Sequence, residues 1–259
     1  ILDLRNNGGG SLKTVVDITG FFIEKGPVVQ VKSIGGRKDI LRDNDPSILW
    51  DGPLVVLVNE FSASASEILA AALQDYNRAI ILGSKQTYGK GTVQNIVDLN
   101  NVISGNTYGD LGSIKITTDK FYRVNGGSTQ LEGVKSDIIF PNRYSYVDIG
   151  EKDLENPLSW DKIDPARYNN SGKIFNYSQV ISDSKERISE NEYFAIIDEH
   201  ASWIKSQQDD KIVSLDYLTY KDDLKSSKSQ NNKLKRIEEF ESPYICLLYT
   251  SPSPRDLSE

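Results

Sequence analysis

The sequence contains one histidine, one cysteine and no methionine. A single cysteine, Cys246, excludes an internal disulfide and leaves the redox compartment open. The only histidine, His200, lies in the polar, helix-like segment 192–205, where a lone histidine is usually a solvated side chain. A Ser-His-Asp or Cys-His hydrolase would have to use this residue. Any hydrolytic activity therefore points to a different general base.

Long apolar runs and excess positive charge are also missing. No run approaches the roughly 18 apolar residues that a transmembrane helix needs, so we predict no membrane span. The net charge of −7 argues against a broad nucleic-acid-binding surface. Because the chain opens on Ile1 within an apolar run and not on methionine, we expect the natural amino terminus to lie upstream.

Residues 1–143 alternate between strand-like and helix-like segments. This pattern predicts an α/β fold in which helices connect largely parallel strands. The predicted strands are 1–4, 28–31, 54–58, 79–82, 93–99 and 114–118, and the predicted helices are 12–22 and 67–76. The runs 54–58, 79–82 and 93–99 are typical of strands buried on both faces. The polar, turn-rich segment 32–50 predicts an excursion over the surface.

The amino-acid composition changes after Pro141. Residues 144–241 are polar, with sparse apolar positions that can anchor amphipathic helices, and predict a small, mainly helical carboxy-terminal domain. Within it, the nearly all-polar segment 221–233 predicts disorder. Residues 242–259 break abruptly from this pattern and contain Ser-Pro-Ser-Pro, so we interpret them as a non-native tail outside the fold.

The first candidate for chemistry is Ser62-Ala63-Ser64-Ala65-Ser66-Glu67, between a buried strand and a helix. A nucleophile needs an exposed oxygen on a rigid turn beside a free backbone N–H, and a helix start supplies such N–H groups. The spacing of Ser64 and Glu67 equally fits a capping box, which is a purely structural role.

The second candidate is Thr87-Tyr88-Gly89-Lys90-Gly91-Thr92, between two strands. A lysine flanked by glycines is usually a solvent-facing turn residue. The pattern of a phosphate-binding loop is not matched, because Gly91, and not serine or threonine, follows Lys90 and because the glycine spacing differs, which argues against a nucleotide role. As a general base the lysine would have to be neutral, a form that burial favours.

The third candidate is Asn6-Asn7-Gly8-Gly9-Gly10, after the first strand. Its glycines permit a close approach of backbone to ligand, and the pattern of a dinucleotide-binding loop is absent. A pocket of amides for an oxyanion and a plain turn before the helix are equally compatible with this segment.

Taken in order, these segments resemble one family. Residues 3–10, 52–59, 62–67, 74–76 and 87–94 are similar to the carboxy-terminal processing serine proteases, in particular to their bacterial tail-specific branch. Residues 121–130 and 133–134 also fit that branch, and 160–164 and 212–215 resemble its helical extension. The resemblance implies a crotonase/ClpP-like spiral α/β core, residues 1–143, with a substrate-binding PDZ domain upstream.

By this resemblance, Ser64 is the nucleophile and Lys90 the general base of a Ser/Lys dyad. Gln94 matches a position that orients the lysine. Asp75 matches an acidic position of the tail-specific branch, where it supports the site or has a structural role at the end of its helix.

The resemblance also implies an oxyanion hole formed by the N–H of Ala65 and of a glycine in the 8–10 run, for which we select Gly9. No metal or organic cofactor is required. The implied substrates are periplasmic proteins with apolar, flexible carboxy-termini, and an adaptor lipoprotein is an implied partner. Two alternatives remain: an inactive binding or scaffold protein on the same core, and a crotonase-type acyl-CoA enzyme.

Overall fold

The computed structural model describes residues 1–102, 105–107, 109–169, 176–212 and 214–238, and the chain forms two compact units. The first unit comprises residues 1–210, and the second begins at Lys211. The described part of the second unit contains helix α6 (Tyr217–Glu238). Among the residues described, no helix has the length and apolar character to cross a membrane.

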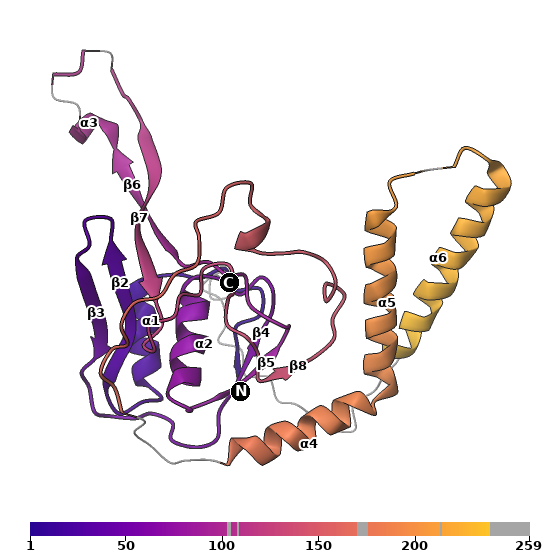
Figure 1. Cartoon of the computed structure of the whole chain (residues 1–259), viewed down its shortest axis with the longest axis horizontal. Helices are drawn as coiled ribbons and strands as arrows, with labels where there is room; N and C mark the ends of the chain where they lie inside the picture. The colour runs from indigo at the N-terminus through magenta and orange to yellow at the C-terminus, as the bar shows by residue number, and fades with distance from the viewer. Residues whose placement is uncertain (103–104, 108, 170–175, 213, 239–259) are drawn as a thin grey trace, which may run out of the picture. The chain divides into compact units, whose positions relative to one another are not determined.

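A parallel sheet forms one side of the first unit (Figure 1). Its strands, in spatial order, are β1 (Leu2–Asp3), β4 (Val55–Val58), β5 (Ile80–Gly83) and β8 (Ile138–Ile139). All three neighbouring pairs are parallel, and Val56 of β4 lies opposite Ile81 of β5. Parallel strands need crossovers, and here helices and long loops supply them.

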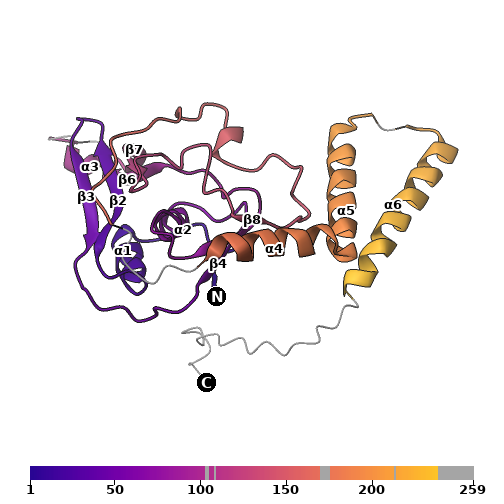
Figure 2. The same ribbon diagram turned by 60° about the horizontal axis from the view of Figure 1, so that its bottom comes forward.

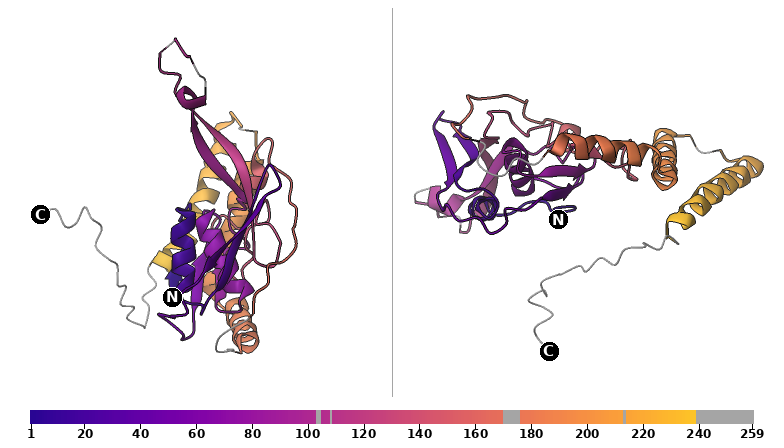
Figure 3. Two further views of the ribbon diagram at one scale, coloured as in Figure 1. Left: turned by 90° about the vertical axis from the view of Figure 1, so that its left-hand side faces the viewer. Right: turned by 90° about the horizontal axis from the view of Figure 1, so that it is seen from below.

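The second sheet is antiparallel. Its order is β3 (Lys38–Asp43), β2 (Gly26–Ser33), β7 (Ser113–Tyr122) and β6 (Thr92–Asp98), and the short helix α3 (Leu99–Val102) follows β6. Strand β7 pairs with β2 only over its last residues, so the outer parts of β6 and β7 extend as a two-stranded arm (Figure 3). Strand β6 is therefore an edge strand.

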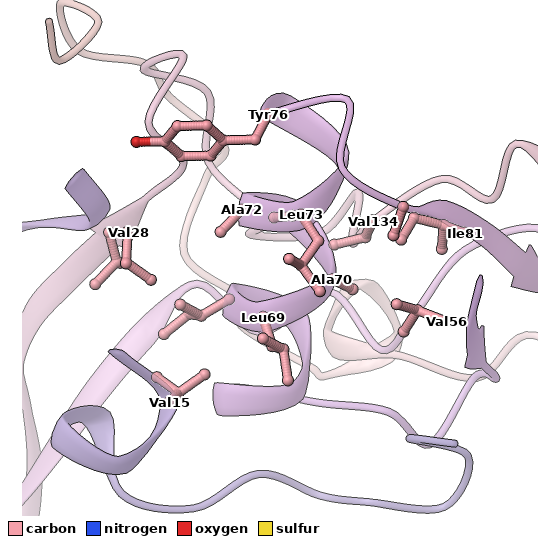
Figure 4. Packing of buried hydrophobic residues seen from close by; sticks show 14 of the residues in the cluster. Val15, Val28, Val56, Leu69, Ala70, Ala72, Leu73, Tyr76, Ile81 and Val134 are labelled. Atoms are coloured by element: carbon pink, nitrogen blue, oxygen red, sulfur yellow. The ribbon is translucent and has the colours of Figure 1, made fainter. Parts of the chain in front are cut away.

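Helix α2 (Ala65–Asp75) lies between the two sheets. Every residue from Ser66 to Leu73 is buried, and the helix is apolar on all sides from Ile68 to Leu73, as expected of a helix in the core. Figure 4 shows Val28 of β2 on one side of this helix and Val56 and Ile81 of the parallel sheet on the other. This packing fixes the start of α2, where the first candidate segment lies.

Helix α1 (Leu12–Gly20) completes the core. The hydroxyl of its N-cap residue, Ser11, accepts a hydrogen bond from the N–H of Thr14, and its inner face buries Val15 and Val16. The loop that precedes α1 contains the third candidate segment.

The carboxy-terminal part of the first unit is helical (Figure 2). It contains a 3₁₀ turn (Glu151–Asp153), α4 (Tyr177–Ser189) and α5 (Glu192–Asp209). The rings of Phe140 and Phe194 stack with centroids 5.0 Å apart, and the hydroxyl of Tyr146 lies 3.0 Å from both carboxylate oxygens of Asp198. These contacts hold α5 against the end of β8.

The predicted α/β core with a helical carboxy-terminal region is confirmed, with four corrections. The strands are not largely parallel, because β3, β2, β7 and β6 form an antiparallel sheet. The segment 32–50 contains the hairpin strand β3 and is not only a surface excursion. Strand β6 is mostly exposed and not buried. Residues 221–233 lie within α6 and are helical, not disordered. The interpretation of 242–259 as a non-native tail concerns residues outside those described, and stays a prediction.

Candidate active site

Ser64 stands at the turn between β4 and α2 in a strained conformation. Its φ of 57° and ψ of −113° lie in a region that side-chain-bearing residues rarely occupy. The turn is anchored from both sides, because the N–H of Ala63 and the hydroxyl of Ser66 both donate to the carbonyl oxygen of Asn7, at 3.0 Å each. Such strain, held in place by its surroundings, is typical of a functional position.

Gly9 packs directly against this turn. A Cβ at position 9 would lie 2.7 Å from Ser64 Cβ and 2.8 Å from the carbonyl oxygen of Ala63, and the φ of Gly9 is +109°. Only glycine fits both constraints. The N–H of Gly9 donates to Asn7 Oδ1 at 2.9 Å, so it is not free for an oxyanion. Gly10, the next residue, lines the cleft beside Ser64.

The N–H of Ala65 is the second predicted oxyanion donor. Ala65 is the first residue of α2, so its N–H has no partner within the helix. It has no acceptor elsewhere in the described part of the chain, and Ala65 lines the same cleft as Ser64. Its position meets the requirement for an oxyanion donor.

Glu67 joins the serine turn to the lysine loop, a role that sequence reasoning missed. Its side chain is fully buried, and its carboxylate accepts four hydrogen bonds. Oε2 accepts from the backbone N–H of Ser64 at 2.7 Å and of Lys90 at 3.0 Å, and Oε1 accepts from Thr87 Oγ1 at 2.6 Å and from the N–H of Gly89 at 2.7 Å. The capping-box spacing signalled the first contact, but nothing local signalled the others.

Burial raises the pKa of Glu67 to about 7, although all four hydrogen bonds act in the opposite direction. The carboxylate is therefore held in place by donors that compensate only part of its lost hydration. A protonated Glu67 would lose at least one of these acceptor contacts.

The backbone of Lys90 is fixed on both sides. Its N–H donates to Glu67, and its carbonyl oxygen accepts from Thr129 Oγ1 at 2.8 Å. A Cβ on Gly89 would lie 3.0 Å from the backbone of Leu131, and one on Gly91 would lie 2.7 Å from the backbone nitrogen of Gln130. The two glycines thus allow the loop to pack closely, so that it is not a free surface turn.

The lysine and serine side chains line one cleft of about 250 Å³. Lys90 Nζ lies 3.5 Å from Gln94 Oε1, and the orienting role of Gln94 stays a prediction. Within the described structure Ser64 Oγ and Lys90 Nζ share no hydrogen bond, which is common before substrate binds. The apolar wall of the cleft is formed by Leu12, Ala65, Ile68, Val93 and Phe121.

Asp75 is not brought to this cleft. It ends α2, the 11-residue helix that begins beside Ser64, so its backbone lies roughly 15 Å away along the axis. Its side chain is 6% exposed and forms an ion pair with Arg123 at 2.6 Å and a hydrogen bond with Asn125 at 2.8 Å. These contacts favour the structural alternative for Asp75.

His200 does not line the cleft either. It lies on α5 with its ring 5.3 Å from that of Trp203, and burial and the charge of Arg143 lower its pKa. Among the described residues no group of histidine, cysteine and acidic side chains is arranged to hold a metal ion.

A serine on a strained strand-to-helix turn that shares a cleft with a lysine is the arrangement of serine hydrolases that use no histidine. Comparison with known proteins identifies the family. The model of peptidase family S41 matches residues 1–140, and the chain belongs to this family. A second family model, the C-terminal domain of tail specific protease, matches residues 144–252.

Individual proteases are also similar to this chain in sequence. The tail-specific protease of Haemophilus influenzae is 42% identical over 245 residues, which cover 91% of this chain and 35% of that protein. The carboxy-terminal-processing protease of Bartonella bacilliformis is 40% identical, over 60% of this chain and 35% of that protein. A solved photosystem II D1 C-terminal processing protease is 36% identical, with a TM-score of 0.47 over 53% of this chain and 33% of that one. The chain thus spans about a third of these relatives.

Proposed function

We propose that this chain is the catalytic part of a serine endopeptidase that cleaves proteins near their carboxy-termini, with Ser64 as nucleophile and Lys90 as general base. The observation that carries the proposal is the shared acceptor Glu67 Oε2, which binds the backbone N–H of both residues. This shared carboxylate holds the serine turn and the lysine loop beside each other, as a Ser/Lys pair requires. Membership of peptidase family S41 supports the same reaction class and gives no support to the acyl-CoA alternative.

The proposed reaction has two halves. In the first, neutral Lys90 removes the proton of Ser64 Oγ as the oxygen attacks the scissile carbonyl carbon. The N–H groups of Ala65 and Gly10 stabilise the resulting oxyanion, Gly10 replacing Gly9 because the N–H of Gly9 is already engaged. The lysine ammonium then protonates the leaving amine, and an acyl-enzyme remains.

In the second half, Lys90 activates a water molecule that attacks the ester carbonyl. Collapse of the second oxyanion releases the new carboxyl group and returns the proton to Ser64 Oγ. Gln94 acts as a positioning residue, since its side-chain oxygen is within reach of the lysine Nζ in the free structure.

The proposal extends to substrate and compartment. The names of the relatives, tail-specific and carboxy-terminal-processing protease, support cleavage near a carboxy-terminus. As substrates we infer periplasmic proteins whose carboxy-termini are apolar and flexible, with an adaptor lipoprotein as a further partner. The apolar wall of the cleft is compatible with such segments.

The test is covalent labelling of the full-length protein with a fluorophosphonate probe, combined with a peptidase assay. Ser64→Ala should remove both labelling and cleavage and leave the unfolding midpoint nearly unchanged, because the loss of a helix cap costs only about 1 kcal/mol. Ser62→Ala and His200→Ala are the controls and should retain labelling. Cleavage by Ser64→Ala above a tenth of the wild-type rate would assign the nucleophile elsewhere, and an unlabelled, inactive wild type would favour the scaffold alternative.

A further inference from the structure

A second cavity, of about 580 Å³, lies between the core and helices α4 and α5, all within the first compact unit. None of its lining residues lines the Ser64 cleft, so it is a separate site. Most of its wall is apolar, and this part is formed by Ile139, Pro141, Val147, Ile149, Ile188 and Phe194. Its volume falls in the range of small-molecule sites, about 300–1,000 Å³.

Glu60 provides an unusual polar group in this wall. The residue is only 9% exposed. Its Oε1 accepts a hydrogen bond from Asn142 Nδ2 at 2.7 Å, whereas its Oε2 is buried and has no hydrogen-bond partner among the described residues. A buried carboxylate oxygen without a donor is costly, because it has lost its water and gained nothing in return. Such an atom, in a residue that lines a cavity, indicates a missing donor.

The chain itself offers no cation for this oxygen in the described structure. Lys85 lines the cavity but forms no ion pair with Glu60, and Lys152 pairs with Asp148 at 3.4 Å. Asp198, also in the lining, accepts from the hydroxyl of Tyr146. The lining therefore carries three carboxylates, Glu60, Asp148 and Asp198, against two ammonium groups, which favours a positively charged ligand.

We propose that this cavity binds an organic ammonium compound, whose N–H donates to the Glu60 carboxylate while its apolar body fills the space between β8 and the two helices. A charge-assisted hydrogen bond of this kind is about twice as strong as a neutral one. The apolar walls then add the burial of the ligand's hydrocarbon.

The cavity is joined to both catalytic loops through the chain. Glu60 lies four residues before Ser64, and Lys85 and Gln86 open the loop that leads to Lys90. On the other side, the N–H of Glu151 donates to the carbonyl oxygen of Tyr88 at 2.9 Å. A bound ligand would therefore contact segments that continue directly into the active site.

The experiment is isothermal titration calorimetry of the full chain with 3-phenylpropylamine and with 3-phenylpropanol, which share a skeleton and differ in charge. We expect the amine to bind at least ten-fold more tightly than the alcohol. Glu60→Gln should abolish this preference, since it replaces the free oxygen by an N–H donor. Ala195→Trp, at an exposed position on α5 that lines the cavity, should weaken both probes by filling the space. Glu24→Gln, which removes an exposed carboxylate elsewhere, is the matched control and should bind like wild type.

Equal affinity for amine and alcohol would overturn the proposal, because the cavity would then select only apolar bodies. Retention of the amine preference in Glu60→Gln would overturn the role of the carboxylate. Absence of binding by either probe up to millimolar concentration would overturn the site as a whole. Thermal unfolding of each variant, measured in parallel, verifies that a loss of binding occurs in a folded chain.

Discussion

The backbone N–H of Ser64 donates to Oε2 of Glu67, three residues later, at 2.7 Å. The same oxygen accepts from the backbone of the lysine loop at 3.0 Å, so a single buried atom determines how two loops approach each other. A displacement of either loop would separate groups that must meet during catalysis, and small displacements cost large factors in rate. Glu67 is therefore a positioning residue for the proposed dyad.

Glu67→Gln should lower both activity and stability. The four groups that contact the carboxylate all donate in the observed arrangement, and an amide can accept on only one side, so two buried donors would face another donor. Leaving buried donors unsatisfied costs about 1–3 kcal/mol each. Urea unfolding should show a loss of roughly 2–4 kcal/mol in the free energy of unfolding. The value of kcat/KM should fall at least ten-fold. Glu132→Gln, at a solvent-exposed ion pair, should be silent in both assays.

Glu67 should also make stability depend on pH in a defined direction. Its pKa is raised from 4.5 to about 7 in the folded chain, so the folded state binds more protons than the unfolded state between these values. The free energy of unfolding should accordingly fall as the pH rises from about 4.5 to 7, by up to about 3 kcal/mol from this group. Glu67→Gln should show a correspondingly flatter profile in urea unfolding at pH 5 and pH 8. Parallel profiles for the two proteins would contradict the burial of an ionisable group here.

Gly9→Ala should inactivate the site, whereas Gly8→Ala should not. The new methyl at position 9 would lie 2.7 Å from Ser64 Cβ and would impose a side chain at a φ of +109°. At Gly8 no heavy atom lies within 4 Å of the added Cβ, and no positive φ is required. We expect at least a 100-fold loss of kcat/KM for Gly9→Ala and less than a two-fold change for Gly8→Ala. Similar activities for the two variants would show that the close contact with Ser64 is not needed.

The variant Asp75→Ala distinguishes a structural role of Asp75 at the end of its helix from a role in supporting the active site. If the residue stabilises the fold through Arg123, its loss leaves a largely buried guanidinium without its partner and costs about 3 kcal/mol. The double variant with Arg123→Ala should then recover part of that loss, as coupled residues do in a mutant cycle. A fall in kcat without any change in stability would instead place Asp75 in the catalytic mechanism.

The parallel sheet and α2 were predictable because each was encoded locally. Continuous apolar runs define β4 and β5, and the uniformly apolar stretch from Ile68 to Leu73 defines the central helix. In the second sheet the sequence predicted strands at the positions of β2, β6 and β7, but it missed β3 and the antiparallel pairing, because β3 carries exposed side chains and is defined by its partner. Helix α6 was missed for a related reason, since its central residues 221–233 contain one large apolar residue, Leu224, and give no apolar face to detect.

The same limit applies to the site. Ser64, Lys90 and Gln94 were named from motifs, and the structure brings them to one cleft. The choice between Gly9 and Gly10 as an oxyanion donor could not be made from the sequence, because the N–H of Gly9 donates to the Asn7 side chain and no spacing rule reveals that bond. Two of the four hydrogen bonds to the Glu67 carboxylate come from the N–H groups of Gly89 and Lys90, more than twenty positions later in the sequence. Only the folded chain places these groups together.

The last prediction concerns Lys90, on which the proposed mechanism depends most directly. A general base must release its proton, and a guanidinium does not do so at accessible pH, so Lys90→Arg should be as inactive as Lys90→Ala. Lys115 lines the same cleft from β7 and is the matched control, because Lys115→Arg keeps its charge at a position with no proposed role in proton transfer. In the full-length protein, kcat/KM should fall at least 1,000-fold for both Lys90 variants and less than three-fold for Lys115→Arg. Thermal unfolding should be nearly unchanged in all three, since the contacts of Lys90 with Glu67 and Thr129 are made by its backbone. Substantial activity in Lys90→Arg would mean that the lysine supplies a fixed positive charge, and the proposed proton transfer from Ser64 would have to be abandoned.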